Sequence, residues 1–106
     1  MGLWVVQQWS VREGDKGACG DALQVIADHI KAEHPEILSV RTQMQWVGSQ
    51  AHRGFLWAEE CDSLTGADSG EHTPACDEVW EPVHQVTLPG THTRGVWFDM
   101  EPSWTR

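Results

Sequence analysis

Hydrophobic and polar positions divide the chain into segments of two kinds. Four segments alternate with the period of a β-strand and are rich in β-branched and aromatic residues; they cover 3–11, 37–47, 53–59 and 92–100. Two segments follow the period of an amphipathic helix, one from Asp21, its expected N-cap, to His34 and one over roughly 73–86. The first helix should end at His34 because Pro35 disfavours the helical conformation of the residue before it. Residues 62–65 could open a further short helix.

The order strand, helix, strand, strand, helix, strand predicts an α+β domain of ferredoxin-like βαββαβ topology. Right-handed crossovers then place both helices on one face of a four-stranded antiparallel sheet. The turn at Gly48-Ser49-Gln50 makes the second and third strands antiparallel neighbours. A length of 106 residues suits one hydrophobic core, so we expect residues 1–106 to form a single domain.

Apolar residues occupy both faces of the expected sheet, and two helices can cover only one of them. The third strand, for example, sets Phe55 and Trp57 on one face and Leu56 on the other. A second copy of the chain, packed sheet to sheet, is the simplest cover for the remaining face. The sequence therefore predicts a homodimer.

Composition and net charge limit the classes of partner that the protein is expected to bind. The formal charge of −9 disfavours binding to nucleic acid and to anionic membrane surfaces. The start of the chain has no long apolar segment and no signal-peptide pattern, which predicts a cytoplasmic protein. Seven Trp and no Tyr suit either a core of bulky residues or an aromatic-walled cavity for a hydrophobic or aromatic small molecule.

The chain carries no motif for a nucleotide, and its cysteines form no zinc-knuckle pattern, so no cofactor is expected. His72 and Cys76 stand four residues apart, with Cys61 as a possible third metal ligand. A cap-region histidine and a buried thiol explain these residues more simply, and no metal is predicted.

Three stretches give the chain a family resemblance. They are His34–Arg41 (HPEILSVR) after the first helix, Phe55–Glu59 (FLWAE) before Asp62–Leu64, and Val79–His84 (VWEPVH) in the second helix. With them the chain resembles the dimeric α+β barrel superfamily, which includes antibiotic-biosynthesis monooxygenases, haem-degrading monooxygenases, NIPSNAP-like proteins and stress-responsive A/B-barrel proteins. The resemblance implies a ferredoxin-like fold that pairs into a dimeric α+β barrel.

The resemblance implies a cavity of the kind found in the monooxygenases. It is lined by an amide of the first strand, a Trp of the third strand and a His of the second helix. The matching residues here are Gln7 or Gln8, Trp57 and His84. We therefore expect His84, Trp57 and Gln8 to be catalytic, with His84 as the general base. The expected substrate-binding residues are Trp57, Phe55, Gln7, His52 and Arg41.

The leading hypothesis is a small homodimeric barrel that binds a flat hydrophobic or aromatic molecule and oxidises it without a cofactor. Such chemistry needs a dry aromatic cavity, a base and hydrogen bonds that hold an anion near dioxygen. One alternative is a haem-binding or haem-degrading protein with His84 as the iron ligand. Another is a non-catalytic dimer, stress-related or structural, whose Trp residues only form the core.

Overall fold

The computed structural model describes residues 2–63 and 74–106, with the side chains of 74–76 excepted. The elements are β1 (Leu3–Ser10), the 3₁₀ helix η1 (Glu13–Asp15), α1 (Lys16–Glu33), β2 (Ile37–Met44), β3 (Gly54–Cys61), α3 (Pro74–Val86) and β4 (Thr93–Phe98). Asp62 and Ser63 form a bend, and the rest of the short helix expected over 62–65 lies outside the described residues. Residue 73, where the second expected helix starts, also lies outside them.

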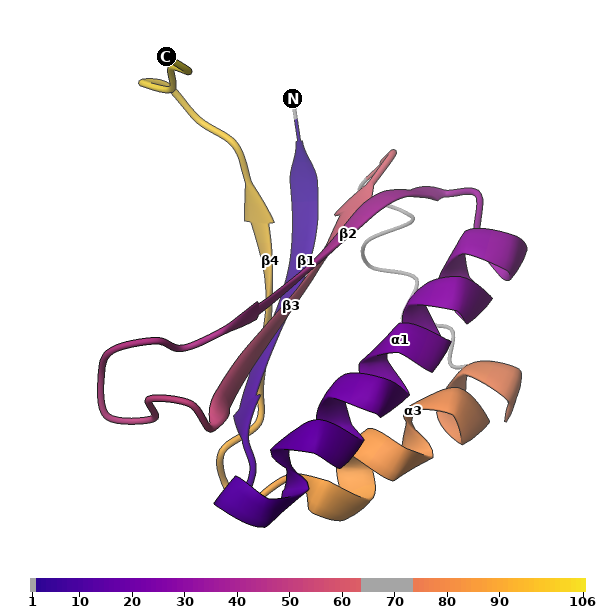
Figure 1. Ribbon diagram of the computed structural model, residues 1–106. Coiled ribbons are helices and arrows are strands. Elements are labelled where there is room, and N and C mark those ends of the chain that lie inside the picture. The colour runs from indigo at the N-terminus through magenta and orange to yellow at the C-terminus, as the bar shows by residue number, and fades with distance from the viewer. Residues whose placement is uncertain (1, 64–73) are drawn as a thin grey trace.

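The four strands form one antiparallel sheet in the order β2-β3-β1-β4, and α1 and α3 both lie on the same side of it (Figure 1). This arrangement confirms the expected ferredoxin-like α+β fold. We call the side of the sheet under α1 and α3 the helix-side face, and the opposite side the open face. Since side chains alternate along a strand, each strand contributes every second residue to each face.

Helix α1 begins earlier than the sequence predicts, at Lys16 and not after Asp21, because η1 leads directly into it. The reason is burial: Cys19 continues the apolar stripe of Leu23, Ile26 and Ile30 one turn towards the N-terminus, and its side chain is fully buried. At the other end, the His34 backbone N–H still bonds the Ile30 carbonyl at 2.9 Å before Pro35 stops the helix.

The connection between β2 and β3 is longer than the expected tight turn, because β2 ends at Met44 and β3 starts at Gly54. Gln45 organises this loop: its carbonyl accepts the His52 N–H at 2.7 Å, and its side-chain Oε1 accepts the Gln50 N–H at 2.8 Å. Two residues take positive φ angles, Gly48 (136°) and His52 (64°). The loop extends beyond the sheet edge and away from the helices (Figure 1).

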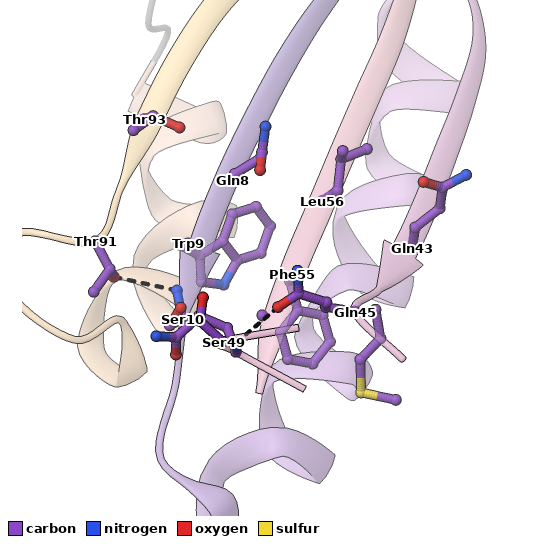
Figure 2. Close-up of a pocket in the computed structure, with 13 residues that line it drawn as sticks. Gln8, Trp9, Ser10, Gln43, Gln45, Ser49, Phe55, Leu56, Thr91 and Thr93 are labelled. Atoms are coloured by element: carbon purple, nitrogen blue, oxygen red, sulfur yellow. Dashed lines mark hydrogen bonds between the residues drawn. The ribbon is translucent and has the colours of Figure 1, made fainter. Parts of the chain in front are cut away.

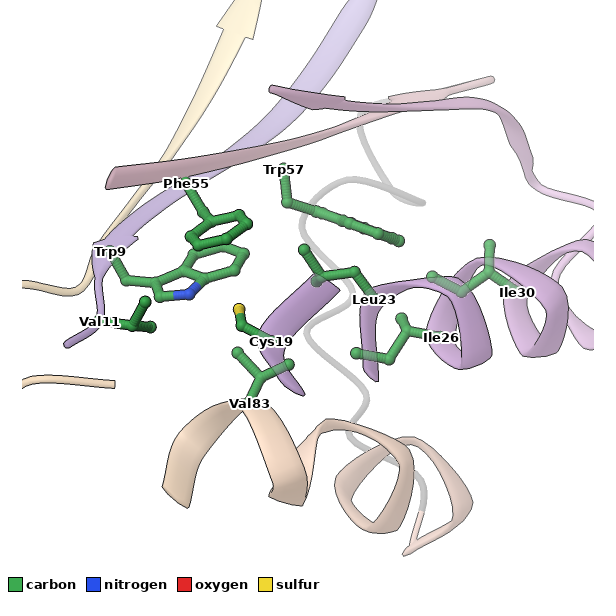
Figure 3. Packing of buried hydrophobic residues seen from close by; sticks show 9 residues of the cluster. All are labelled: Trp9, Val11, Cys19, Leu23, Ile26, Ile30, Phe55, Trp57 and Val83. Carbon is green, nitrogen blue, oxygen red and sulfur yellow. The ribbon is translucent and has the colours of Figure 1, made fainter. Parts of the chain in front are cut away.

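The core lies between the helix-side face and the two helices (Figure 3). Its largest fully buried side chain is Trp57 of β3, and the rings of Trp9 and Phe55 stack at 6.0 Å between centroids. Helix α1 supplies its apolar stripe, and α3 supplies Val83. The Trp-rich composition is thus explained in part by a core built from bulky rings.

Among the described residues, no helix is long and apolar enough to cross a membrane.

Candidate functional site

A cavity of about 220 Å³ lies between α3 and the helix-side face of β1. We call it the α3 pocket. Its aromatic wall consists of Trp9 and Trp80, and its polar groups come from Gln7, His84 and His92. The pocket therefore combines ring surfaces with a few converging polar groups, as small-molecule sites commonly do.

Trp80 is the centre of the aromatic wall. Its ring packs nearly perpendicular to two deeper indoles, with centroid distances of 5.3 Å to Trp57 and 6.2 Å to Trp9. One helical turn later, the His84 imidazole stacks against Trp80 with centroids 6.4 Å apart and an interplanar angle of 21°. Residues i and i+4 share one helix face, so α3 presents both rings to the pocket.

The segment from Thr87 to His92 closes the pocket below α3. Thr87 ends the helix by bonding the Val83 carbonyl through both its N–H (3.0 Å) and its hydroxyl (2.8 Å). Gly90, with a φ of 78°, turns the chain back towards β1. His92 then lies beside β1, where its Nε2 is 2.9 Å from the Gln7 Oε1.

A second cavity of about 440 Å³ opens mainly on the open face, near the β2–β3 loop (Figure 2). We call it the open-face pocket. Its polar lining is uncharged and includes Gln8, Gln43, Gln45 and Thr93. It is the larger of the two cavities, but none of its lining residues can act as a base near neutral pH.

The structure brings only part of the expected site together. Gln7 and His84 both line the α3 pocket, and Trp57 supports it from behind by packing against Trp80. Gln8, by contrast, lines the open-face pocket, because neighbouring residues of a strand point to opposite faces. The sheet therefore separates Gln8 from His84.

The remaining predicted binding residues also lie away from the α3 pocket. Phe55 packs on Trp9 and lines the open-face pocket. His52 lies in the β2–β3 loop, with its ring 4.9 Å from that of Trp46. The guanidinium of Arg41 lies 5.4 Å from the centroid of the Trp4 ring on the open face.

Glu59 is a polar residue on the helix-side face of β3, two residues after Trp57. It is half-buried, and its Oε1 accepts the Trp57 indole N–H at 2.8 Å. Burial raises the pKa of the Glu59 carboxyl, an effect that the Trp57 hydrogen bond and the positive charge of Arg94 oppose. The alternation of β3 predicts that Glu59 lies on the buried face of the sheet, because it stands two residues from Trp57.

Trp80 and His92 are the other pocket residues that sequence reasoning left out. For Trp80 a signal existed, because it precedes His84 by one helical turn. For His92 there was none, since it meets Gln7 across 85 positions of sequence. Among the described residues, no group of His, Cys, Asp and Glu could hold a metal ion, while His72 and the side chain of Cys76 lie outside them.

No protein-family model matches the chain, and no curated protein matches it in sequence. Solved structures do match its fold. A proposed antibiotic biosynthesis monooxygenase from Nitrosomonas europaea is 13% identical, with 97% of this chain and 94% of that chain covered and a TM-score of 0.73.

Two further structures show the range of proteins that share this fold. A variant of SnoaB, a cofactor-independent oxygenase from Streptomyces nogalater, is 10% identical over 96% of this chain and 98% of its own, with a TM-score of 0.73. A dimeric protein of unknown function from Bacteroides fragilis is 8% identical over 91% and 94%, with a TM-score of 0.70. At these identities the similarity establishes the ferredoxin-like fold, and the same fold serves different activities.

Proposed function

We propose that the α3 pocket binds a small, flat aromatic molecule and that the protein oxidises it with dioxygen, without a cofactor, in the manner of antibiotic-biosynthesis monooxygenases. One observation carries this proposal: the His84 imidazole is stacked on Trp80 in the same pocket that the bonded pair of Gln7 and His92 lines. The pocket thus joins a base, a ring surface and a polar pair.

The size of the pocket limits the ligand. Its volume of about 220 Å³ is below the ~300–1,000 Å³ typical of sites for drug-sized molecules. One aromatic ring or two fused rings suit it. Haem, a macrocycle of four pyrrole rings, is larger than the pocket that His84 lines, which supports the aromatic ligand over the haem alternative.

His84 supplies the first chemical step. Its side chain is exposed, so the imidazole can pass a proton on to solvent after taking it from the hydroxyl of a bound phenol. The resulting electron-rich anion is the reductant for dioxygen. For 1-naphthol the balance is C10H8O + O2 → C10H6O2 + H2O: four electrons pass to dioxygen, one oxygen atom becomes the second quinone carbonyl, and the other leaves as water.

The fold comparison supports this reaction class, because the SnoaB structure is described as a cofactor-independent oxygenase. It also supports a homodimer as the working form, since the Bacteroides fragilis protein of this fold is described as dimeric. In such a dimer the open face would be covered by the second copy. The open-face pocket would then belong to the interface, and the α3 pocket would remain on the helix side of each copy.

The test is oxygen uptake and Trp fluorescence with 1-naphthol as the probe. We expect 1-naphthol to quench the fluorescence of the pocket indoles and to be oxidised by the wild type. His84→Ala should lower the oxidation rate at least about 100-fold, the usual contribution of a general base, while binding persists. The control is His52→Asn, which alters a histidine remote from the α3 pocket and keeps a side chain that tolerates positive φ.

Three results would contradict parts of this proposal. Binding without oxygen uptake would leave the non-catalytic alternative, and equal rates in the wild type and His84→Ala would remove His84 as the base. Addition of haemin tests the remaining alternative: a Soret shift that disappears in His84→Ala would favour haem over the aromatic ligand.

A further inference from the structure

The bonded pair of His92 and Gln7 is the best-defined polar feature of the α3 pocket. The His92 Nε2 lies 2.9 Å from the Gln7 Oε1, and both residues line the cavity. An amide oxygen can only accept a hydrogen bond, so the His92 nitrogen donates. The contact joins the loop before β4 to the middle of β1.

Hydrogen bonds of the loop before β4 set the position of His92. The Leu88 N–H donates to the Ser10 carbonyl at 2.8 Å, which ties the loop to the end of β1. The Thr91 hydroxyl donates to the Leu88 carbonyl at 2.7 Å and accepts the Ser10 N–H at 3.1 Å. His92 follows directly after this anchor, so its place next to Gln7 is set by the fold of the loop.

The hydrogen bond also fixes which end of the Gln7 amide is left for a ligand. With its oxygen occupied by His92, Gln7 can offer only the N–H groups of its Nε2, and this nitrogen has no hydrogen-bond partner in the part of the chain that the structure describes. Without His92 the amide could turn and present its oxygen, which repels an anion.

The neighbouring charges suit a negative ligand atom at this position. Arg94 is the register partner of Gln7 on β4 and shares the helix-side face with it. On β3, the register partner of Gln7 is Trp57, and Glu59 lies two residues further along that strand. The Glu59 carboxyl already accepts the Trp57 N–H, and burial raises its pKa. The register thus places a cationic side chain, that of Arg94, on the β4 side of Gln7.

We infer that His92 is a positioning residue that holds the Gln7 amide as an N–H donor for the oxygen of a phenolate or enolate, so that the pocket prefers the ionised ligand to its neutral analogue. The inference rests on the proposed aromatic site and names the chemical form of the ligand that it selects. Stabilising this anion would favour the deprotonation that His84 performs.

The test compares 4-nitrophenol with its methyl ether, 4-nitroanisole, at alkaline pH, where the phenol is ionised and the ether has no charge. Binding is measured by quenching of Trp fluorescence, because Trp9 and Trp80 line the pocket. We expect the wild type to bind 4-nitrophenolate more tightly than the ether. His92→Ala should weaken phenolate binding about tenfold, as expected for the loss of one hydrogen bond to a charged group.

Binding of 4-nitroanisole to His92→Ala should stay within about twofold of the wild type, because the rings that form the pocket wall are unchanged. His92→Gln should restore part of the phenolate preference, since its amide can donate to the Gln7 oxygen. Gln7→Glu, which places an acceptor-only carboxylate at the same position, should abolish the preference.

The outcomes separate this inference from the proposed function. If His92→Ala weakens both probes equally, or neither, the positioning role is wrong while the aromatic pocket stands. If the wild type binds both probes without preference, the selection of an anion is likewise overturned. If the wild type binds neither probe, the proposed aromatic site itself fails and the inference fails with it.

Discussion

Two of the buried indoles differ in how their N–H groups are satisfied. Trp57 is fully buried, yet its Nε1 donates to the Glu59 carboxylate at 2.8 Å. The Trp9 Nε1 is also buried but has no oxygen or nitrogen acceptor among the described residues, and it points towards the thiol of Cys19, a weak acceptor (Figure 3). Burial of an ionisable acceptor is therefore the cost of satisfying Trp57.

Burial of the Glu59 carboxyl predicts that the free energy of unfolding depends on pH, and Glu59→Gln should remove this dependence. Because burial raises the Glu59 pKa, the folded chain binds more protons at this site than the unfolded chain does. The contribution of Glu59 to the free energy of unfolding is therefore fully present below the ordinary pKa of 4.5 and is lost as pH rises through the raised, folded value.

Glutamine keeps an oxygen for the Trp57 N–H and carries no charge. Urea unfolding should accordingly show Glu59→Gln to be more stable than the wild type at neutral pH, with the difference vanishing below pH 4.5. A variant that is less stable at neutral pH would mean that the Glu59 charge stabilises the fold, contrary to the direction given by its burial.

The residues of the α3 pocket show why the site could be predicted only in part. Gln7 and Gln8 were equivalent candidates, because β1 is apolar on both faces: Val5 and Trp9 lie on one, and Trp4 on the other. Alternation therefore could not decide which glutamine faces the helices. The partner of Gln7, His92, depends on a loop conformation that no local pattern encodes.

The helices and strands were predictable from the sequence because their hydrophobic periods are strong. The stripe of α1 and the alternation of β3 were read correctly, and together they place the core between sheet and helices. The boundaries were less predictable. Gly17 and Gly20 suggest a loop or a weak helix start, but burial of Cys19 between them favours the helix.

That conflict between local preference and burial gives a prediction for α1. A Cβ added at Gly20 would meet no heavy atom within 4 Å, and Gly20 is exposed within the helix. Gly20→Ala should therefore raise the free energy of unfolding by about 0.5–1 kcal/mol, since alanine loses less backbone entropy on folding.

Gly54→Ala is the matched control for this substitution. Its Cβ would lie 3.0 Å from the Gln50 Cβ and 3.3 Å from the Gln50 carbonyl oxygen, so the β2–β3 loop would have to shift. Thermal unfolding should show a higher midpoint for Gly20→Ala and a lower one for Gly54→Ala. A lower midpoint for Gly20→Ala would mean that the start of α1 does not have the helical geometry described above.

Strand β4 is the part of the molecule best suited to contact a second copy of the chain. It is an edge strand, and three consecutive apolar side chains remain exposed: Val96 on the helix-side face (43%), Trp97 on the open face (62%) and Phe98 on the helix-side face (63%). An edge strand that is apolar on both faces is a surface for association. This strand, together with the uncovered open face, is where we expect the second copy to bind.

Trp97→Glu should weaken this association, because it places a charge at the centre of the expected interface. Val25→Glu is the control: Val25 is similarly exposed (60%) but lies on α1, on the other side of the molecule from the open face. Sedimentation velocity should show the wild type and Val25→Glu as dimers and Trp97→Glu as a monomer. A monomeric wild type at micromolar concentration would contradict the homodimer directly.

The dependence of dimerisation on ionic strength provides a second test of this interface. Each chain carries a formal charge of −9, so two copies repel each other and the dimer should tighten as salt screens that repulsion. Both glutamate variants add one negative charge per chain, but only that of Trp97→Glu would face its symmetry mate across the interface. Raising the ionic strength from about 0.05 to 0.5 M should therefore lower the dimer dissociation constant more for Trp97→Glu than for Val25→Glu. An equal response would mean that net charge alone controls association, and would place the contact away from β4.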